Sequence, residues 1–238
     1  MPNLKDTKLD LANFRGRFLI YGPSGAGKTT FAGTFPRPFF LDFDHKLLCL
    51  AGKDIQYESF HADKEGASDE SVRFRSILKQ RKSDPTVDTI VLDGITVLDA
   101  YSVRWAMKQT GKSHPMPTQE AYGVQYDFYK WLFMELNDPG IQKNIVVIAH
   151  EQYMVDEESG IHTILPLITG KKMPGMLPGL FQETYYMQAV DSGGKTIHRL
   201  HYRPKGKAVA NTQMLRGNEG FIDDPSYEKV LALARGGK

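Results

Sequence analysis

The chain has 238 residues, of which 41% are hydrophobic and 24% are charged, and its formal net charge is +2. These values are typical of a globular protein with one sizeable core, and the charge is too small to identify a polyanionic partner. A single cysteine excludes an internal disulfide, and no apolar run reaches the length of a membrane span. Residues 1–13 form a polar segment without a hydrophobic signal core, so we expect a cytosolic protein with one α/β domain over residues 14–235.

The first predicted element is a buried strand from Arg17 to Tyr21, and it leads into a glycine-rich loop and a helix that begins near Thr29. The loop, residues 22–29, fits the phosphate-binding pattern G-x-x-x-x-G-K-[ST] at every fixed position, and we call it the P-loop. In this pattern backbone N–H groups surround the α- and β-phosphates, Lys28 reaches the β/γ oxygens and the Thr29 hydroxyl ligates Mg²⁺. A turn without a ligand would not need lysine followed by threonine at the start of the helix. The predicted nucleotide contacts are Gly22, Pro23, Ser24, Gly25, Ala26, Gly27, Lys28, Thr29 and Thr30.

The next predicted elements are a strand over 38–44, a short strand over 55–60, a helix over 68–82 and an apolar strand over 89–93. The first of these strands carries Asp42 and Asp44, which strand alternation places on the same face. The last delivers Asp93 to the C-terminal edge of a parallel sheet, where ligands bind in α/β folds. Asp93 is therefore predicted to support Mg²⁺ with Thr29, and the alternative is an aspartate that caps the turn before Gly94.

The remaining elements are helices over 95–109 and 119–136, an apolar strand over 144–150, alternating segments over 161–168, 183–190 and 195–202, and a short helix over 227–235. Strands that alternate with helices predict a mostly parallel sheet flanked by helices, with hairpins or antiparallel edge strands in the C-terminal third. His198 and His201 stand three apart in one predicted strand and so point to opposite faces, and we assign no transition metal.

The carboxylate that activates water must come from outside the Asp93 strand, because Asp93 is followed by glycine and not by the glutamate of many ring-forming ATPases. Asp42 and Asp44 are the candidates, and Asp44 is favoured because it lies nearer the end of its strand. This arrangement, with the stretch FLDFDH at 40–45, resembles the RecA-like recombinase core. The resemblance implies catalytic roles for Asp44 and Lys28. RecA itself has glutamate at the position of Asp44, and the shorter side chain implies a differently placed water or slower turnover.

The same resemblance places a sensor of the γ-phosphate among His150, Glu151 and Gln152. More narrowly, residues 14–216 resemble the phage-encoded RecA-like ATPases of single-strand annealing. The matching stretches are GPSGAGKTT, FLDFD, TIVLDG, the helix start AYGV at 121–124, IVVIAHE and ITGKKMPGMLPGLF. The resemblance implies ATP and Mg²⁺, single-stranded DNA, self-assembly with ATP at subunit interfaces, and the host cytoplasm. It leaves open a single-strand binding protein as a further partner.

Basic residues supply the remaining candidates. Lys205 and Lys207 are predicted to reach the ATP of a neighbouring subunit, and the alternative is a solvated hairpin tip. The candidates for DNA contact are Lys108, Lys112 and His114 in one region and Lys171 and Lys172 in another. An aromatic series at helical spacing favours core packing over base stacking; it consists of Tyr122, Tyr126, Tyr129 and Phe133.

Three other functions compete with a recombinase. A transporter-type ATPase is disfavoured because its signature should precede the Mg²⁺ aspartate, whereas the similar stretch DSGG at 191–194 follows it. A kinase of a small molecule or nucleotide would need an arginine-rich lid, and no matching cluster lies between the two core strands. A nucleotide-gated binding module with little hydrolysis stays open, because aspartate at position 44, in place of glutamate, implies slow turnover. Hydrolysis stimulated by DNA would separate the recombinase from the kinase and the module.

Overall fold

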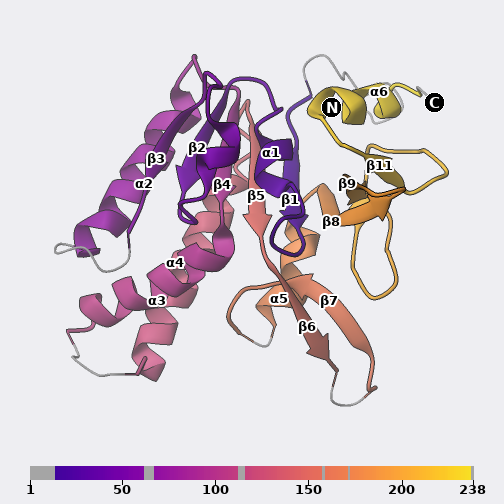
Figure 1. Cartoon of the computed structure of the whole chain (residues 1–238). Helices are drawn as coiled ribbons and strands as arrows, with labels where there is room; N and C mark the ends of the chain where they lie inside the picture. The colour runs from indigo at the N-terminus through magenta and orange to yellow at the C-terminus, as the bar shows by residue number, and fades with distance from the viewer. Residues whose placement is uncertain (1–13, 62–66, 112–115, 157–158, 171, 237–238) are drawn as a thin grey trace, which may run out of the picture.

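The computed structural model describes residues 14–61, 67–111, 116–156, 159–170 and 172–236, and its centre is a nine-stranded sheet (Figure 1). The strands are β1 (Arg17–Tyr21), β2 (Pro38–Asp42), β3 (Gln56–Ser59), β4 (Thr89–Asp93), β5 (Asn144–Ala149), β8 (Glu183–Ser192), β9 (Lys195–His201), β10 (Asn211–Thr212) and β11 (Phe221–Asp223). Their order is β11-β9-β8-β1-β5-β4-β2-β3, and β10 pairs with β8. The pairings from β8 to β3 are parallel, whereas β9, β10 and β11 pair antiparallel. The predicted fold class is confirmed.

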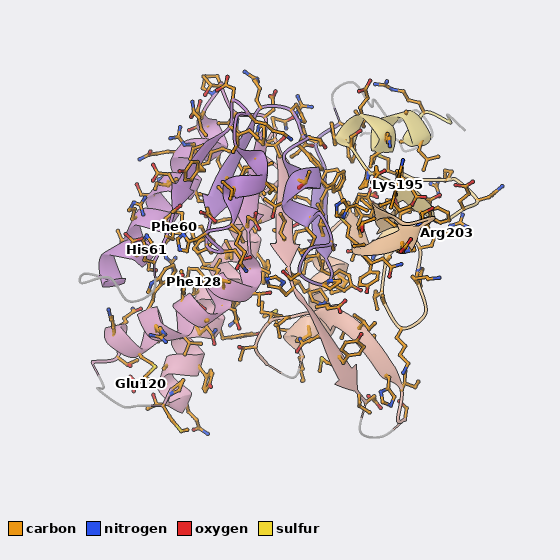
Figure 2. All side chains as sticks on the ribbon, in the orientation of Figure 1. Phe60, His61, Glu120, Phe128, Lys195 and Arg203 are labelled. Atoms are coloured by element: carbon orange, nitrogen blue, oxygen red, sulfur yellow. The ribbon has the colours of Figure 1, made fainter. Side chains whose placement is uncertain are left out.

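Helices cover both faces of this sheet. They are α1 (Lys28–Ala32), α2 (Ala67–Ser83), α3 (Ile95–Gln109), α4 (Gln119–Leu136), α5 (Met173–Met176) and α6 (Tyr227–Ala234), with 3-10 helices η2 (Leu47–Leu50) and η3 (Leu177–Leu180). Leu19 and Tyr21 of β1 pack toward α2, α3 and α4, where Phe60 and Phe128 lie (Figure 2). Phe18 and Ile20 point to the other face and pack with residues of α1 and α6. A strand covered on both faces is apolar throughout, which explains why β1 and β4 have continuous buried runs.

A separate two-stranded hairpin follows β5 after a single residue, His150. Its strands are β6 (Glu151–Val155) and β7 (His162–Pro166), and it extends away from the edge of the main sheet (Figure 1). The sequence predicted a strand near β7 but not its partner β6. The polar residues that begin β6 follow the apolar strand directly. Their pattern contains no signal that a second sheet begins there.

The strand predicted over 38–44 ends at Asp42, and this corrects one expectation. The N–H groups of Phe43 and Asp44 donate to the carbonyl of Asp93 at 2.6 and 3.3 Å, and the N–H of His45 donates to Asp42 Oδ1 at 2.8 Å. These bonds turn the chain, so strand alternation does not continue to Asp44. Asp42 and Asp44 line different cavities, and the prediction that they share a face is wrong.

The aromatic series on α4 divides between core and surface. Tyr129 and Phe133 are buried and stack on each other, in agreement with core packing. Tyr122 and Tyr126 are exposed. Within the described ranges, no helix combines the length and the apolar character that crossing a membrane requires.

Candidate functional site

The P-loop connects β1 to α1, and its path depends on glycine at two positions. Gly22 has a φ of 150°, and a Cβ there would lie 2.0 Å from the carbonyl oxygen of Met187 on β8. Gly27 has a φ of 85°, and a Cβ there would lie 2.8 Å from Cγ of His198 on β9. Any side chain at either position would collide with a strand or strain the backbone. The neighbouring strands therefore hold the loop close against the sheet.

Lys28 lies within the curve of the loop. Its ammonium donates to the carbonyl oxygens of Gly22 and Pro23 at 2.9 and 2.7 Å, and its side chain is buried. Burial lowers the pKa of Lys28 to about 8, and the carboxylates of Asp93 and Asp44 oppose this effect. Phosphate oxygens are the counter-charges that such a buried ammonium needs. The Lys28 ammonium therefore lies inside the loop, and its contact with phosphates stays a prediction.

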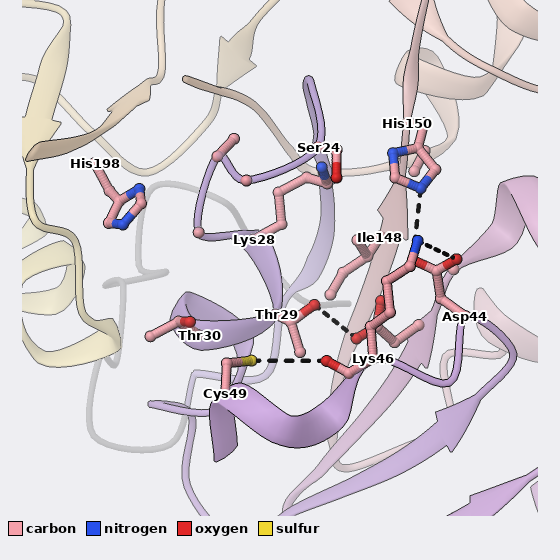
Figure 3. A pocket seen from close by; sticks show the side chains of 16 residues that line it. Ser24, Lys28, Thr29, Thr30, Asp44, Lys46, Cys49, Ile148, His150 and His198 are labelled. Carbon is pink, nitrogen blue, oxygen red and sulfur yellow. Dashed lines mark hydrogen bonds and ion pairs between the residues drawn. The ribbon is translucent and has the colours of Figure 1, made fainter. Parts of the chain in front are cut away.

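Thr29 and Asp93 form a pair beside Lys28. Thr29 Oγ1 donates to Asp93 Oδ2 at 2.8 Å, which joins the start of α1 to the end of β4 (Figure 3). Burial raises the pKa of Asp93 to about 6, with the Thr29 hydrogen bond acting in the opposite direction. A hydroxyl beside a carboxylate is the oxygen donor set that Mg²⁺ uses in proteins. These two residues fit a magnesium ion, and the direct bond between them disfavours a mere turn cap for Asp93.

Asp44 and His150 lie together on one side of this pair. His150 Nε2 is 3.5 Å from Asp44 Oδ2, and Lys46 Nζ is 3.2 Å from the same oxygen. The pKa of Asp44 is lowered, first by His150 and then by Lys46. Both residues line a cavity of about 340 Å³, which we call the P-loop cavity (Figure 3). It is lined by residues 24–30, Asp44, Lys46, Cys49, Asp93, Gly94, residues 148–150 and His198.

The three candidates for a γ-phosphate sensor point in different directions. His150 lines the P-loop cavity, and its backbone N–H is held by Thr96 Oγ1 at 3.0 Å. Glu151 has a buried Oε2 without a hydrogen-bond partner in the described part of the chain. Gln152 donates to the carbonyl of Pro166 at 2.9 Å and so ties β6 to the end of β7. Of the three residues, His150 is the one on the cavity wall.

The predicted trans-acting lysines lie outside this cavity. Lys205 and Lys207 are exposed in the turn between β9 and β10. The carbonyl of Lys207 accepts from the N–H of Ile164 at 2.8 Å, so the turn packs against β7. Their action on a neighbouring subunit stays a prediction.

The DNA candidates are only partly described. Lys108 is exposed in the last turn of α3, and Lys172 is exposed at the N-cap of α5. Neither lines the P-loop cavity. Lys112, His114 and Lys171 lie outside the described residues.

Three ionisable cavity residues were not predicted for the site from the sequence, namely Lys46, Cys49 and His198. Alternation indicated only that His198 and His201 point to opposite faces of their strand. It carried no signal that the face of His198 meets the P-loop, because that depends on the order of the strands.

Comparison with known proteins agrees with this geometry. A sequence profile of the AAA domain family matches residues 15–214. The SPbeta prophage-derived uncharacterized protein YorG of Bacillus subtilis (strain 168) is 23% identical over 137 residues, which are 55% of this chain and 39% of that protein. The chain therefore spans about two fifths of the length of this relative. Since the profile covers most of the chain, the chain belongs to the AAA domain family of P-loop, ATPase-like proteins.

Proposed function

We propose that this protein binds Mg·ATP in the P-loop cavity and hydrolyses it. The observation that carries this proposal is the meeting, in one cavity, of Lys28, the Thr29–Asp93 pair and the Asp44 carboxylate. A phosphoryl-transfer site needs a cation for the phosphates, oxygen ligands for magnesium and a group that orients the attacking water. The cavity contains a candidate for each.

The chemistry divides among these residues as follows. Lys28 holds the β- and γ-phosphates, and Thr29 and Asp93 hold the magnesium ion, which when bound neutralises charge on the phosphates. Asp44 accepts a hydrogen bond from the attacking water and orients it in line with the γ-phosphorus. His150 and Lys46 lower the pKa of Asp44 and so keep this carboxyl ionised. Only the ionised form has both oxygens free to accept a hydrogen bond from water. His150 is also the residue best placed to detect the γ-phosphate.

The proposal extends to single-stranded DNA and to an assembly with ATP between subunits, acting in phage recombination or strand annealing. The resemblance to phage RecA-like ATPases and the similarity to a prophage-derived protein support it. The β6–β7 hairpin supports it as well, because it begins directly after His150 and carries Tyr153 with 70% of its surface exposed. An exposed aromatic ring can stack on a base, and the basic turn at 205–207 lies against the same hairpin.

The test is Mg²⁺-dependent ATP hydrolysis with and without single-stranded DNA, together with ATP binding by calorimetry. Lys28→Ala should lose ATP binding. Asp44→Asn should keep ATP binding and lose turnover by about 100-fold or more, since it removes the group that positions the water. Asp54→Asn is the matched control, because this carboxylate is exposed in the segment that follows the same strand and does not line the P-loop cavity. It should turn over ATP at the native rate.

Each part of the proposal can fail separately. Native turnover in Asp44→Asn would remove Asp44 from the mechanism. A rate unchanged by DNA would remove the recombinase assignment and leave an ATPase with another partner. ATP binding without turnover in the native chain would favour the nucleotide-gated binding module.

A further inference from the structure

His198 is a polar side chain of the P-loop cavity to which the mechanism above gives no task. It lies on β9, and its ring reaches the cavity beside Gly27. In Figure 3 it stands on the opposite side of Lys28 from Asp44 and His150. The cavity thus has a polar group at each end, with the P-loop between them.

The ring nitrogen Nδ1 of His198 is buried and has no hydrogen-bond partner in the described residues. An unsatisfied buried polar atom costs free energy, and in native proteins such atoms usually have a functional reason. An apolar side chain would fill the space beside Gly27 without this cost. The unpartnered nitrogen therefore points to a ligand that the imidazole meets when the cavity is filled.

The backbone holds His198 firmly in this place. Its N–H donates to Asp224 Oδ1 at 3.0 Å, and its carbonyl accepts from the N–H of Asp224 at 2.6 Å. On its other side His198 pairs with Ala189 of β8. These contacts fix the backbone of His198, and Gly27 lies directly against its ring, so the side chain is held beside the P-loop.

The two ends of the cavity correspond to the two ends of a nucleotide. Lys28 and the Thr29–Asp93 pair mark the β- and γ-phosphates, and Asp44 and His150 lie beyond them on the γ side. The opposite end of the cavity, where His198 lies, is therefore left for the α-phosphate and the ribose.

We propose that His198 contacts the nucleoside end of the bound nucleotide, at the ribose or the α-phosphate, and so contributes to the preference for a nucleoside triphosphate over pyrophosphate. This inference rests on the proposed nucleotide-binding function. The neutral imidazole has one donor and one acceptor, so it can donate to the α-phosphate or accept from a ribose hydroxyl.

The test is calorimetric titration of the full chain with Mg·ATP, Mg·2′-dATP and magnesium pyrophosphate, which offers two phosphates, enough for the β and γ positions alone. His198→Ala should weaken ATP binding by about 5- to 10-fold, the size expected for one lost hydrogen bond, and should leave pyrophosphate binding unchanged. His198→Asn retains a polar atom near the position of Nδ1 and should restore most of the affinity. Thr196→Ala, an exposed change on the same strand, is the control and should bind like the native chain. A loss confined to ATP assigns the contact to the ribose 2′-hydroxyl, whereas an equal loss for ATP and dATP assigns it to the α-phosphate or the 3′-hydroxyl.

Two results would overturn the inference while leaving the proposed function intact. One is native ATP affinity in His198→Ala. The other is an equal loss for ATP and pyrophosphate, which would mean that His198 only supports the P-loop through Gly27. If the native chain binds neither ligand, the proposed function itself fails and takes the inference with it. Thermal unfolding of each variant shows that the fold is retained.

Discussion

Burial acts against charge on both sides of the P-loop cavity. It lowers the pKa of Lys28 to about 8 and raises that of Asp93 to about 6, so each group is moved toward its neutral form. Phosphates and a magnesium ion would restore the charged forms by supplying the missing counter-charges. Opposing shifts of this kind are typical of functional sites, where stability is given up for binding.

A different histidine allows a pH prediction away from this cavity. His201 is buried between the rings of Tyr186 and Phe221, with Gln188 Nε2 at 3.1 Å from its Nε2. Burial lowers its pKa to about 4; the positive charges of Lys205 and Arg199 add to this, and Asp223 opposes it. The folded state favours the neutral ring, whereas in the unfolded chain the pKa of this histidine is about 6.5. The free energy of unfolding is therefore highest above pH 6.5 and falls as the pH drops toward 4.

The expected loss from His201 between pH 6.5 and pH 4 is up to about 3 kcal/mol of unfolding free energy. His201→Gln removes the titrating group, so its unfolding free energy should change less than that of the native chain over this range. Urea unfolding at pH 7, 6, 5 and 4 measures the difference. His162→Gln, at an exposed position on β7, should keep the native dependence. Equal pH profiles for native protein and His201→Gln would contradict the prediction.

At the scale of elements, α3 links the end of β4 to the segment that follows the hairpin. Thr96 in its first turn accepts from the N–H of His150 and donates to the carbonyl of Leu167 at 2.8 Å. One turn later, Asp99 accepts from the N–H of Thr169 at 2.9 Å, from its hydroxyl, and from Gln125 and Tyr129 of α4. Asp99 therefore joins three segments that are separate in the sequence.

Asp99→Ala should lower the unfolding free energy by about 3 kcal/mol, because it leaves several buried donors without an acceptor. Chemical denaturation measures this loss, and hydrogen exchange should show faster opening around Thr169. Asp127→Ala is the control, since this aspartate is exposed on α4, and among the described residues its polar contact is with Lys130 at 3.4 Å. A loss no larger than that of the control would show that Asp99 does not hold these segments together.

At the scale of the whole molecule, the position of the basic turn bears on assembly. Lys205 and Lys207 are exposed and lie against β7, away from the P-loop cavity of their own chain. If they serve a site, a head-to-tail contact must bring them to the cavity of a neighbour, and such contacts build rings or filaments. The prediction can be tested by mixing variants.

Lys28→Ala and the double variant Lys205→Ala/Lys207→Ala should each have little ATPase activity alone. An equal mixture should recover about a quarter of the native rate, since that share of interfaces pairs an intact cavity with an intact basic turn. A mixture of Lys28→Ala with Asp44→Asn should recover none, because both residues act within one cavity. Failure of the first mixture to exceed its components would argue against action in trans.

Local pattern was enough to determine the P-loop, Asp93 and most of the strands. The P-loop is contiguous, so its residues meet whatever the rest of the chain does, and Asp93 follows from an apolar run whose C-terminal end must lie at the sheet edge. The alternation within each strand depends only on backbone geometry. Elements too short to show a repeating hydrophobic pattern were not predicted, among them α5, β10 and β11.

Which side chains complete the cavity depends on contacts between segments that are distant in the sequence. Asp44 faces it because hydrogen bonds to Asp93 and Asp42 turn the chain two residues before the predicted end of the strand. His198 reaches Gly27 because β8 and β9 follow β1 in the sheet, an order that no local pattern contains. Periodicity reports how a segment faces its surroundings, whereas the identity of its neighbours depends on contacts between segments far apart in the chain.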